Sequence, residues 1–141
     1  MIQRTFAMIK PDAVKAGNIG NIINIAQEAG LKIVAMKMMK YTRAQAEGFY
    51  AVHKGKPFFE GLMNYITEGP LVAIIFEGED AISVWRKTMG ATDPTKAEPG
   101  TIRALYAEST TRNSVHGSDA VETAAAEIAY IFSGLSLVSL E

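Results

Sequence analysis

Apolar residues gather along the chain in short runs that have the length of β-strands. The runs lie at 3–9, 31–39, 71–76 and 113–116. The first and third are almost continuously apolar, which is typical of strands buried on both faces. The second alternates, with Leu31, Ile33 and Ala35 expected on one face, so it indicates a strand with at least one well-buried face.

Apolar residues at helical spacing predict five helices. They lie at 19–26, 42–52, 57–66, 80–89 and 119–132. Two of them begin with a capping-box pattern, Thr42 with Gln45 and Asp119 with Glu122, in which side chains satisfy the first free backbone N–H groups. Asp80 is the expected N-cap of the fourth helix, and the third is expected to begin at a proline.

The order of these elements is β-α-β-α-α-β-α-loop-β-α. It predicts an α+β protein, a ferredoxin-like α/β sandwich in which a four-stranded antiparallel sheet is covered by helices. A doubly wound parallel sheet would need more strands. The length of 141 residues fits one domain over 1–141. The stretch 91–100 has no periodicity, and loops of this length are usually functional or disordered.

Composition and charge exclude several classes of protein. Fourteen Lys and Arg against fifteen Asp and Glu give a net charge of −1, which argues against binding to nucleic acid or to membranes by bulk attraction. The absence of cysteine excludes disulfide scaffolds, thiolate metal sites and thiol catalysis. The apolar N-terminal stretch breaks at Lys10 and Pro11, before a signal-peptide core could form. We therefore expect a cytoplasmic protein.

Several familiar site motifs are missing. The sequence has no G-x-x-x-x-G-K-[ST], no G-x-G-x-x-G and no G-x-S-x-G, and it has no H-E-x-x-H or Cys/His cluster. These absences exclude a P-loop, a dinucleotide-binding fingerprint, a serine-hydrolase elbow and a zinc site. We accordingly expect no metal held by the protein alone.

The two histidines differ in their surroundings. His116 lies at the end of a predicted strand and is followed by Gly117, Ser118 and Asp119. A neutral imidazole there is free to act as a base or a nucleophile, although a histidine that merely ties down a turn would look the same. His53 is better explained as a helix C-terminal residue favourable to the helix dipole.

Cations form a second candidate feature. Lys10, Arg86, Arg103 and Arg112 lie near predicted element ends or in loops, and Thr92 could add a hydroxyl. Arginine forks and lysine point charges are what a polyphosphate needs. Each cation alone is most often a solvated surface charge, so the interest lies in their position around the long loop and His116.

Aromatic and acidic residues complete the candidates. Of Phe58 and Phe59, one at an exposed helix start could stack on a nucleobase, and the alternative is that both belong to the core. Glu127 lies among alanines on the last predicted helix, where the default interpretation is a solvent-facing helix former.

Asn113-Ser-Val-His-Gly-Ser-Asp119 resembles the active-site signature of nucleoside diphosphate kinases. Five further motifs resemble that family in the same order and at similar spacing. They are Arg4 to Asp12, Lys56-Pro-Phe-Phe59, Glu68-Gly-Pro70, Gly90-Ala-Thr-Asp-Pro94 and Pro99-Gly-Thr-Ile-Arg103. The resemblance covers essentially the whole chain. Departures are Leu105, where the family commonly has an acidic residue, and Ala120, where serine is usual.

The resemblance implies an enzyme that moves the γ-phosphoryl group of ATP or another nucleoside triphosphate to a nucleoside diphosphate such as GDP. It implies a ping-pong route through phosphorylated His116, attacking through Nδ1, with low base specificity. Mg²⁺ would arrive with the nucleotide. Relatives of this kind are homo-oligomers, either tetramers or hexamers.

The same resemblance assigns roles residue by residue. Glu127 would orient the imidazole, with Tyr50 and Ser118 beside it. The residues implied to bind nucleotide are Lys10, Phe58, Arg86, Thr92, Arg103 and Asn113.

Two alternatives belong to other classes. A non-catalytic nucleotide-binding module on the same fold would be favoured by loss of His116, which is present. A nucleic-acid-binding domain of ferredoxin-like shape would need a basic face and an RNP-like aromatic stretch, and the sequence offers neither.

Overall fold

The computed structural model describes residues 1–134, 137 and 139–140. Its four strands are β1 (Ile2–Ile9), β2 (Lys32–Met39), β3 (Leu71–Glu79) and β4 (Val115–Gly117). They form one sheet in the order β2-β3-β1-β4, and each neighbouring pair is antiparallel. The expected four-stranded antiparallel sheet of a ferredoxin-like sandwich is confirmed.

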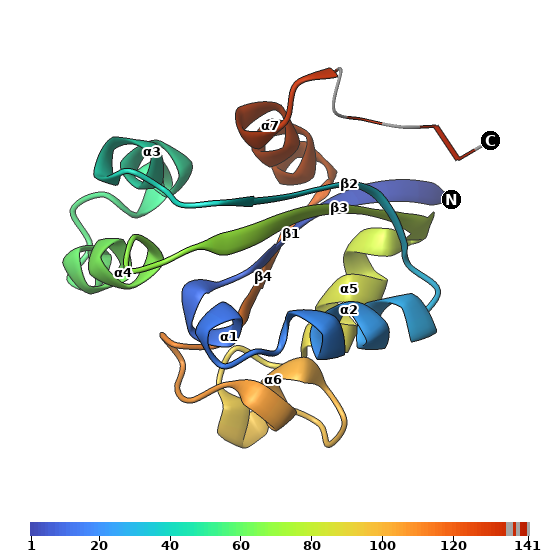
Figure 1. Cartoon of the computed structure of the whole chain (residues 1–141), viewed down its shortest axis with the longest axis horizontal. Coiled ribbons are helices and arrows are strands. Elements are labelled where there is room, and N and C mark those ends of the chain that lie inside the picture. Colours follow the sequence, from blue (N-terminus) through green and yellow to red (C-terminus); the bar gives the residue numbers. More distant parts are fainter. Residues whose placement is uncertain (135–136, 138, 141) are drawn as a thin grey trace.

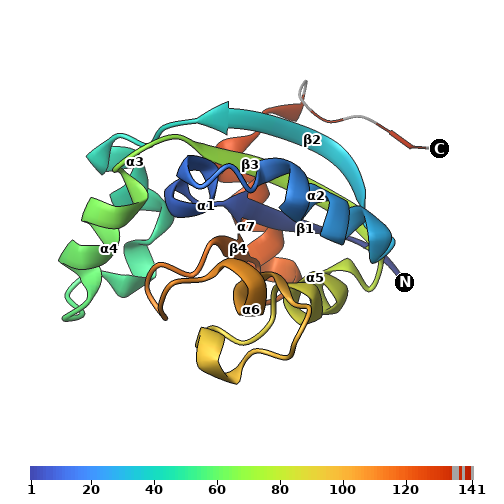
Figure 2. The same cartoon turned by 60° about the horizontal axis from the view of Figure 1, so that its bottom comes forward.

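Helices cover both faces of this sheet. They are α1 (Pro11–Lys15), α2 (Ile19–Glu28), α3 (Arg43–Phe49), α4 (Phe59–Ile66), α5 (Ala81–Met89), α6 (Ile102–Tyr106) and α7 (Val121–Ile131). Figure 1 shows α7 above the sheet, α3 and α4 at its left end and the other four helices below it, and Figure 2 turns the lower group toward the viewer. Residues of α3, α4 and α7 share one core cluster. Short 3₁₀ turns lie at Ala51–His53 and Pro94–Lys96.

The apolar run of β1 supplies both layers of the core, because successive side chains of a strand point to opposite faces. Phe6 and Met8 pack in the cluster with α3, α4 and α7. Ala7 and Ile9 pack in the cluster with α1, α2, α5 and α6. All four side chains are fully buried, so β1 is the central support of the molecule.

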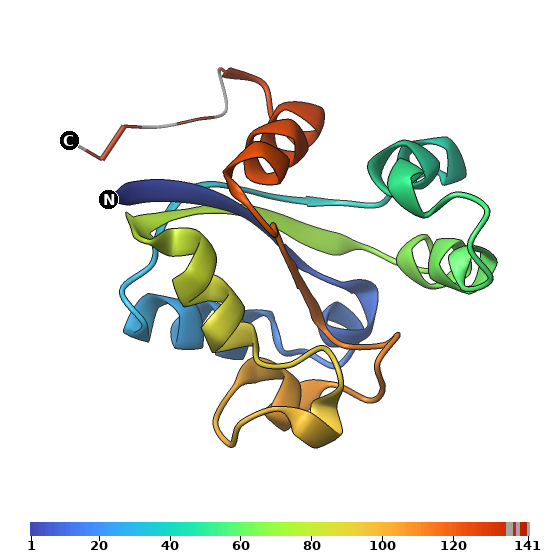
Figure 3. The same cartoon turned by 180° about the vertical axis from the view of Figure 1, so that it is seen from behind.

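The same alternation decides where His116 points. In β4, which pairs with β1 at an edge of the sheet, Val115 belongs to the core below the sheet. The side chain of His116 therefore faces the opposite side, where α3 and α7 lie. From β4 the chain passes into α7, as Figure 3 shows from behind. This short edge strand thus delivers the histidine to the helical face that carries Glu127.

Three local expectations are wrong in whole or in part. The strand at 31–39 does not alternate throughout: its pairing with β3 shifts between Ile33 and Ala35, so a bulge puts Ala35 on the face opposite Leu31 and Ile33. Asp80 is the N-cap residue of α5, as expected, but its φ is 49° and its side chain makes no capping hydrogen bond. The third error concerns the start of α7.

Asp119 and Glu122 do not form the capping box expected there. The N-cap of α7 is Ala120, whose backbone N–H donates to the hydroxyl of Thr123 at 2.9 Å. Asp119 instead pairs with Arg86 of α5 at 2.7 Å. A carboxylate near a helix start can cap or form an ion pair, and here the neighbouring guanidinium prevails.

Sequence periodicity also missed two short helices. α1 and α6 have five residues each, which is too short for a helical pattern of apolar residues to be recognised. α6 follows the loop expected at 91–100, and its Arg103 is buried. The third predicted helix begins at Phe59 rather than Pro57, a difference typical of helix ends.

Candidate active site

A cleft of about 670 Å³ opens around His116. Nine of the ten residues expected at a nucleotide site line it, and the tenth, Ser118, lies behind it. The nine are Lys10, Tyr50, Phe58, Arg86, Thr92, Arg103, Asn113, His116 and Glu127. Cations, a histidine and aromatic rings from distant parts of the sequence therefore share one space.

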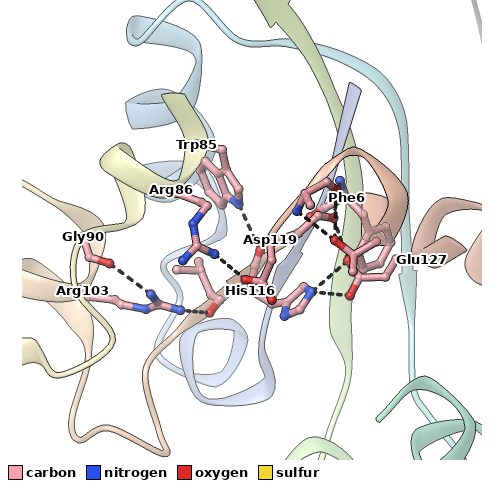
Figure 4. A network of polar contacts seen from close by, with 12 residues as sticks. Phe6, Trp85, Arg86, Gly90, Arg103, His116, Asp119 and Glu127 are labelled. Atoms are coloured by element: carbon pink, nitrogen blue, oxygen red, sulfur yellow. Dashed lines mark hydrogen bonds and ion pairs between the residues drawn. The ribbon is translucent and has the colours of Figure 1, made fainter. Parts of the chain in front are cut away.

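His116 is held at one ring nitrogen. Its Nε2 lies 3.1 and 3.2 Å from the two carboxylate oxygens of Glu127, as Figure 4 shows. A carboxylate can only accept, so this contact places the proton on Nε2. Nδ1 then carries the free lone pair, and it makes no hydrogen bond within the described part of the chain.

Glu127 is itself held by Ser118. The Ser118 hydroxyl donates to Glu127 at 2.6 Å and accepts from the backbone N–H of Phe6 at 3.2 Å. Because Ser118 is buried and fixed to β1, the carboxylate has one defined position. The default interpretation of Glu127 as a solvent-facing helix former is therefore wrong.

Aromatic rings surround the imidazole on the side of α3. The ring centroids of Phe49, Tyr50 and Phe6 lie 5.4, 6.4 and 6.1 Å from that of His116. Burial, followed by the charge of Glu127, raises the pKa of Tyr50, so its hydroxyl stays neutral. This wall excludes water from one side of the ring and restricts its rotation.

The backbone of His116 is anchored to α5. Trp85 donates from its indole Nε1 to the carbonyl of His116 at 3.0 Å. Gly117 follows, and a Cβ there would lie 2.6 Å from both Trp85 and Met89. The glycine next to the histidine is therefore required by the close approach of α5, a reason that the sequence alone did not reveal.

Lys10 and Asn113 form a polar pair beside the histidine. Lys10 Nζ donates to Asn113 Oδ1 at 2.9 Å, and both side chains are buried. Burial, reinforced by the positive charge of Arg103, lowers the pKa of Lys10 to about 8, while Asp12 opposes this effect. An ammonium group with little water around it is a strong partner for an anion.

Two arginines close the other side of the cleft. Arg103 donates to the carbonyls of Gly90 at 3.1 Å and Val115 at 2.9 Å, which fixes its guanidinium. Burial and the nearby charge of Arg86 lower the pKa of Arg103 to about 10, so it remains charged at neutral pH. Arg86 is half exposed and paired with Asp119, and Figure 4 shows both arginines on the same side of His116.

The two phenylalanines of the Lys56–Phe59 motif separate as expected. Phe58 is 50% exposed at the cleft, whereas Phe59 is buried in the core. Phe58 meets the ring of His53 at a centroid distance of 5.3 Å. His53 ends the 3₁₀ turn after α3 and also lines the cleft, a position that its local sequence did not indicate.

Arg112 is the one expected cation that the structure places elsewhere. It pairs with Glu68 at 2.8 Å and Glu108 at 3.0 Å, and it does not line the cleft. Sequence reasoning also missed Phe49 and Asp119 as lining residues. Phe49 has no local signal, because only the packing of α3 brings it to the histidine, whereas Asp119 lies in the same signature as His116 but was expected to cap the following helix.

Metal ligands are few in this region. Across residues 1–134, 137 and 139–140, no group of three or more His, Cys, Asp or Glu side chains could hold a metal ion. Over the same residues, no helix is long and apolar enough to cross a membrane.

The fold and the cleft define an α+β sandwich that presents a fixed histidine among positively charged side chains. Comparison with known proteins identifies the family. The model of the family described as "Nucleoside diphosphate kinase" matches residues 3–137. The chain belongs to the nucleoside diphosphate kinase family, and it is an enzyme that transfers phosphoryl groups.

Relatives and solved structures match over nearly their whole length. A nucleoside diphosphate kinase of Nitratidesulfovibrio vulgaris is 56% identical over 138 residues, covering 98% of this chain and 99% of the relative. One from Thiobacillus denitrificans is 60% identical over 131 residues, covering 93% and 92%. The Halobacterium salinarum enzyme, solved in complex with CDP, has a TM-score of 0.95 at 43% identity, covering 100% and 94%.

Proposed function

We propose that this chain transfers the γ-phosphoryl group of a nucleoside triphosphate to a nucleoside diphosphate in two steps, through a phosphohistidine at His116. The observation that carries the proposal is the hydrogen bonding of the ring. Nε2 is occupied by Glu127, so the lone pair of Nδ1 is left without a hydrogen-bond donor within the described residues. A positioned nucleophile of this kind is what covalent catalysis requires.

In the first step, the Nδ1 lone pair attacks the γ-phosphorus and the bond to the β-phosphate oxygen breaks. The departing electron pair stays on the nucleoside diphosphate, which leaves. The Nε2 proton remains on the ring, and the carboxylate of Glu127 stabilises the resulting positive charge. In the second step, a β-phosphate oxygen of another nucleoside diphosphate attacks the phosphorus and breaks the N–P bond.

The remaining side chains bind and orient the phosphates. Phosphoryl transfer depends on in-line positioning and on neutralisation of charge on the equatorial oxygens. Lys10, Arg86 and Arg103 lie around the histidine and supply three positive charges. Arg86 must exchange at least part of its contact with Asp119 for phosphate, which the 78% exposure of the Asp119 side chain permits.

Mg²⁺ would enter this cleft bound to the phosphates of the nucleotide. Mg²⁺ is usually held by one or two carboxylates together with substrate phosphates. Asp119 is the exposed carboxylate at the cleft, since Glu127 is engaged by His116 and Ser118. The ion neutralises phosphate charge when it is bound.

Broad tolerance of different nucleobases follows from the side chain on which the base would stack. Phe58 offers a ring face, which stacks on any nucleobase without reading its edge. We therefore propose that ATP, GTP and pyrimidine nucleotides all serve. We also predict that the chain forms a homo-oligomer, either a tetramer or a hexamer, and that it is cytoplasmic. We predict no binding to nucleic acid or to membranes.

The test is the mass of the intact protein after brief mixing with Mg·ATP, kept at neutral or alkaline pH so that a phosphohistidine survives. We expect one added phosphoryl group, its removal by GDP, and no adduct in His116→Ala. If ATP binds but no adduct forms, the covalent route is wrong and the chain is a nucleotide-binding relative.

A further inference from the structure

One buried carboxylate near the cleft is not used by the chemistry described above. Asp12 lies in the first turn of α1, directly after Lys10 and Pro11, and its side chain is buried. It does not cap α1, because Lys10 is the N-cap and the helix has no capping hydrogen bond from a side chain. A buried carboxylate needs partners elsewhere, and those of Asp12 come from two distant parts of the chain.

Each oxygen of Asp12 has one partner. Oδ1 accepts from the hydroxyl of Tyr65 in α4 at 2.5 Å. Oδ2 accepts from the backbone N–H of Ser114 at 3.1 Å. Burial, followed by the hydrogen bond to Asp12, raises the pKa of Tyr65, so that hydroxyl remains a donor. The carboxylate therefore joins α1, α4 and the segment before β4.

The backbone of Ser114 is strained. Its φ is +73°, in a region that residues other than glycine rarely adopt. The N–H of Val115 donates to the carbonyl of Asn113 at 2.8 Å, so a three-residue γ-turn of the rare positive-φ kind is centred on Ser114. Such a conformation persists only where the surrounding structure enforces it.

The turn separates two parts of the phosphate-transfer site. On one side, Asn113 binds Lys10 through its side chain, and the N–H of Lys10 donates to the carbonyl of Ser114 at 2.8 Å. On the other side, Val115 leads directly to His116. A change in this turn would therefore move the phosphate-binding pair relative to the nucleophile.

We propose that Asp12, held by Tyr65, is a positioning residue for this reaction: its carboxylate fixes the γ-turn at Ser114 and thereby the placement of Lys10 and Asn113 relative to His116. The inference rests on the proposed phosphohistidine route. Asp12 does not line the cleft, so it acts only through its neighbours.

Asp12→Ala and Asp12→Asn form the central comparison. Alanine removes both acceptors, and a small misplacement of reacting groups can slow a reaction about 100-fold. We expect the rate of His116 phosphorylation at saturating Mg·ATP to fall about 10- to 100-fold, with a much smaller change in half-saturation. Asparagine keeps an acceptor for Ser114 and can donate to Tyr65, so it should restore most of the rate.

This comparison separates geometry from charge, because Asp12 also raises the pKa of Lys10. If Asp12→Asn is as slow as Asp12→Ala, the negative charge matters rather than the turn, and the proposal is overturned. It is also overturned if Asp12→Ala reacts at the rate of the parent chain. If the parent chain itself forms no phosphohistidine, the proposed function fails instead.

Ser114→Gly gives an independent test, since glycine adopts positive φ without strain. In the Ser114→Gly background, Asp12→Ala should slow phosphorylation several-fold less than it does in the parent chain. An equal loss in both backgrounds contradicts the proposal. Thermal unfolding checks that each variant is folded. If Asp12→Ala does not fold, Tyr65→Phe replaces it, because this variant removes the hydroxyl that holds Asp12. The proposal is overturned if Tyr65→Phe is phosphorylated at the same rate as the parent chain.

Discussion

Three side chains of the cleft show how local surroundings change the chemistry of a residue. Glu127 fixes the proton of His116 on Nε2, burial lowers the pKa of Lys10, and Phe58 keeps a half-exposed ring beside His53. Each of these conditions follows from partners that only the folded chain brings together. Two of them lead to predictions that can be measured on single variants.

We predict that kcat/KM falls as pH rises through about 8, the pKa to which burial and Arg103 lower that of Lys10. Below this pH the amine is charged and attracts phosphate, and above it the charge is lost. Because kcat/KM reports the free enzyme, the fall should be present even though bound phosphate raises the pKa. Arg103, with a pKa of about 10, stays charged over this range.

Steady-state assays from pH 6.5 to 9.5, about 1.5 units on either side of 8, make the comparison. Lys10→Met should have a lower kcat/KM that no longer falls near pH 8. The same fall in that variant would assign it to another group.

Phe58→Ala should weaken the binding of ATP, GTP and CTP to a similar degree. Loss of a stacking contact costs about 1–3 kcal/mol, which is about 5- to 150-fold in the dissociation constant. Phe59→Leu is the matched control, because Phe59 is buried in the core and its loss should lower stability rather than affinity. Binding titrations with the three nucleotides decide, and a loss confined to one base would contradict stacking.

Among the secondary-structure elements, β4 is short and is held in place by its contacts with neighbouring elements. It has three residues, pairs with β1, and packs against Trp85 of α5. Because the strand carries His116, the contact between α5 and β4 fixes the nucleophile from the side opposite to Glu127.

We therefore predict that Gly117→Ala lowers the free energy of unfolding by about 1–3 kcal/mol, the usual cost of overpacking. The new methyl group would lie 2.6 Å from Trp85 and Met89, and the tryptophan ring has no room to move. Gly61→Ala in α4 is the control, since nothing lies within 4 Å of its Cβ, and it should stabilise by about 0.5–1 kcal/mol. Denaturant unfolding followed by Trp85 fluorescence measures both, and equal stability of the two variants would refute the argument.

For the whole molecule, the sheet brings residues from every quarter of the chain to one cleft. The order β2-β3-β1-β4 leaves β2 at an edge, and two of its methionines, Met36 and Met38, are 52% and 59% exposed. An edge strand with exposed apolar side chains is a surface on which a second chain can pair.

We predict that the chain is a homo-oligomer, a tetramer or a hexamer, in dilute buffer. Light scattering coupled to size exclusion gives the mass directly, against 15.2 kDa for one chain. Met36→Glu with Met38→Glu should reduce the mass if β2 is part of the interface, while Val52→Glu, at another exposed apolar position (81% exposed), serves as the control. A monomeric parent chain would contradict the prediction.

Much of the fold could be predicted because its signals are local. The β1 and β3 runs, the Thr42–Gln45 capping box and the separation of Phe58 from Phe59 are all present as expected. The wrong expectations involve partners that local patterns do not specify. Asp119 could cap α7 or pair with Arg86, and the bulge near Ile33 depends on pairing with β3.

By itself, the sequence determined the four strands, the five longer helices and the antiparallel sandwich, because periodicity and caps are encoded in neighbouring residues. The residues that we propose for phosphate chemistry came from the resemblance of its motifs to a known family. The tertiary structure alone decided which nitrogen of His116 is free, how far the pKa of Lys10 is lowered, and why Ser114 adopts a strained turn. These properties depend on burial and on hydrogen bonds between residues up to 112 positions apart, which exist only once the chain has folded.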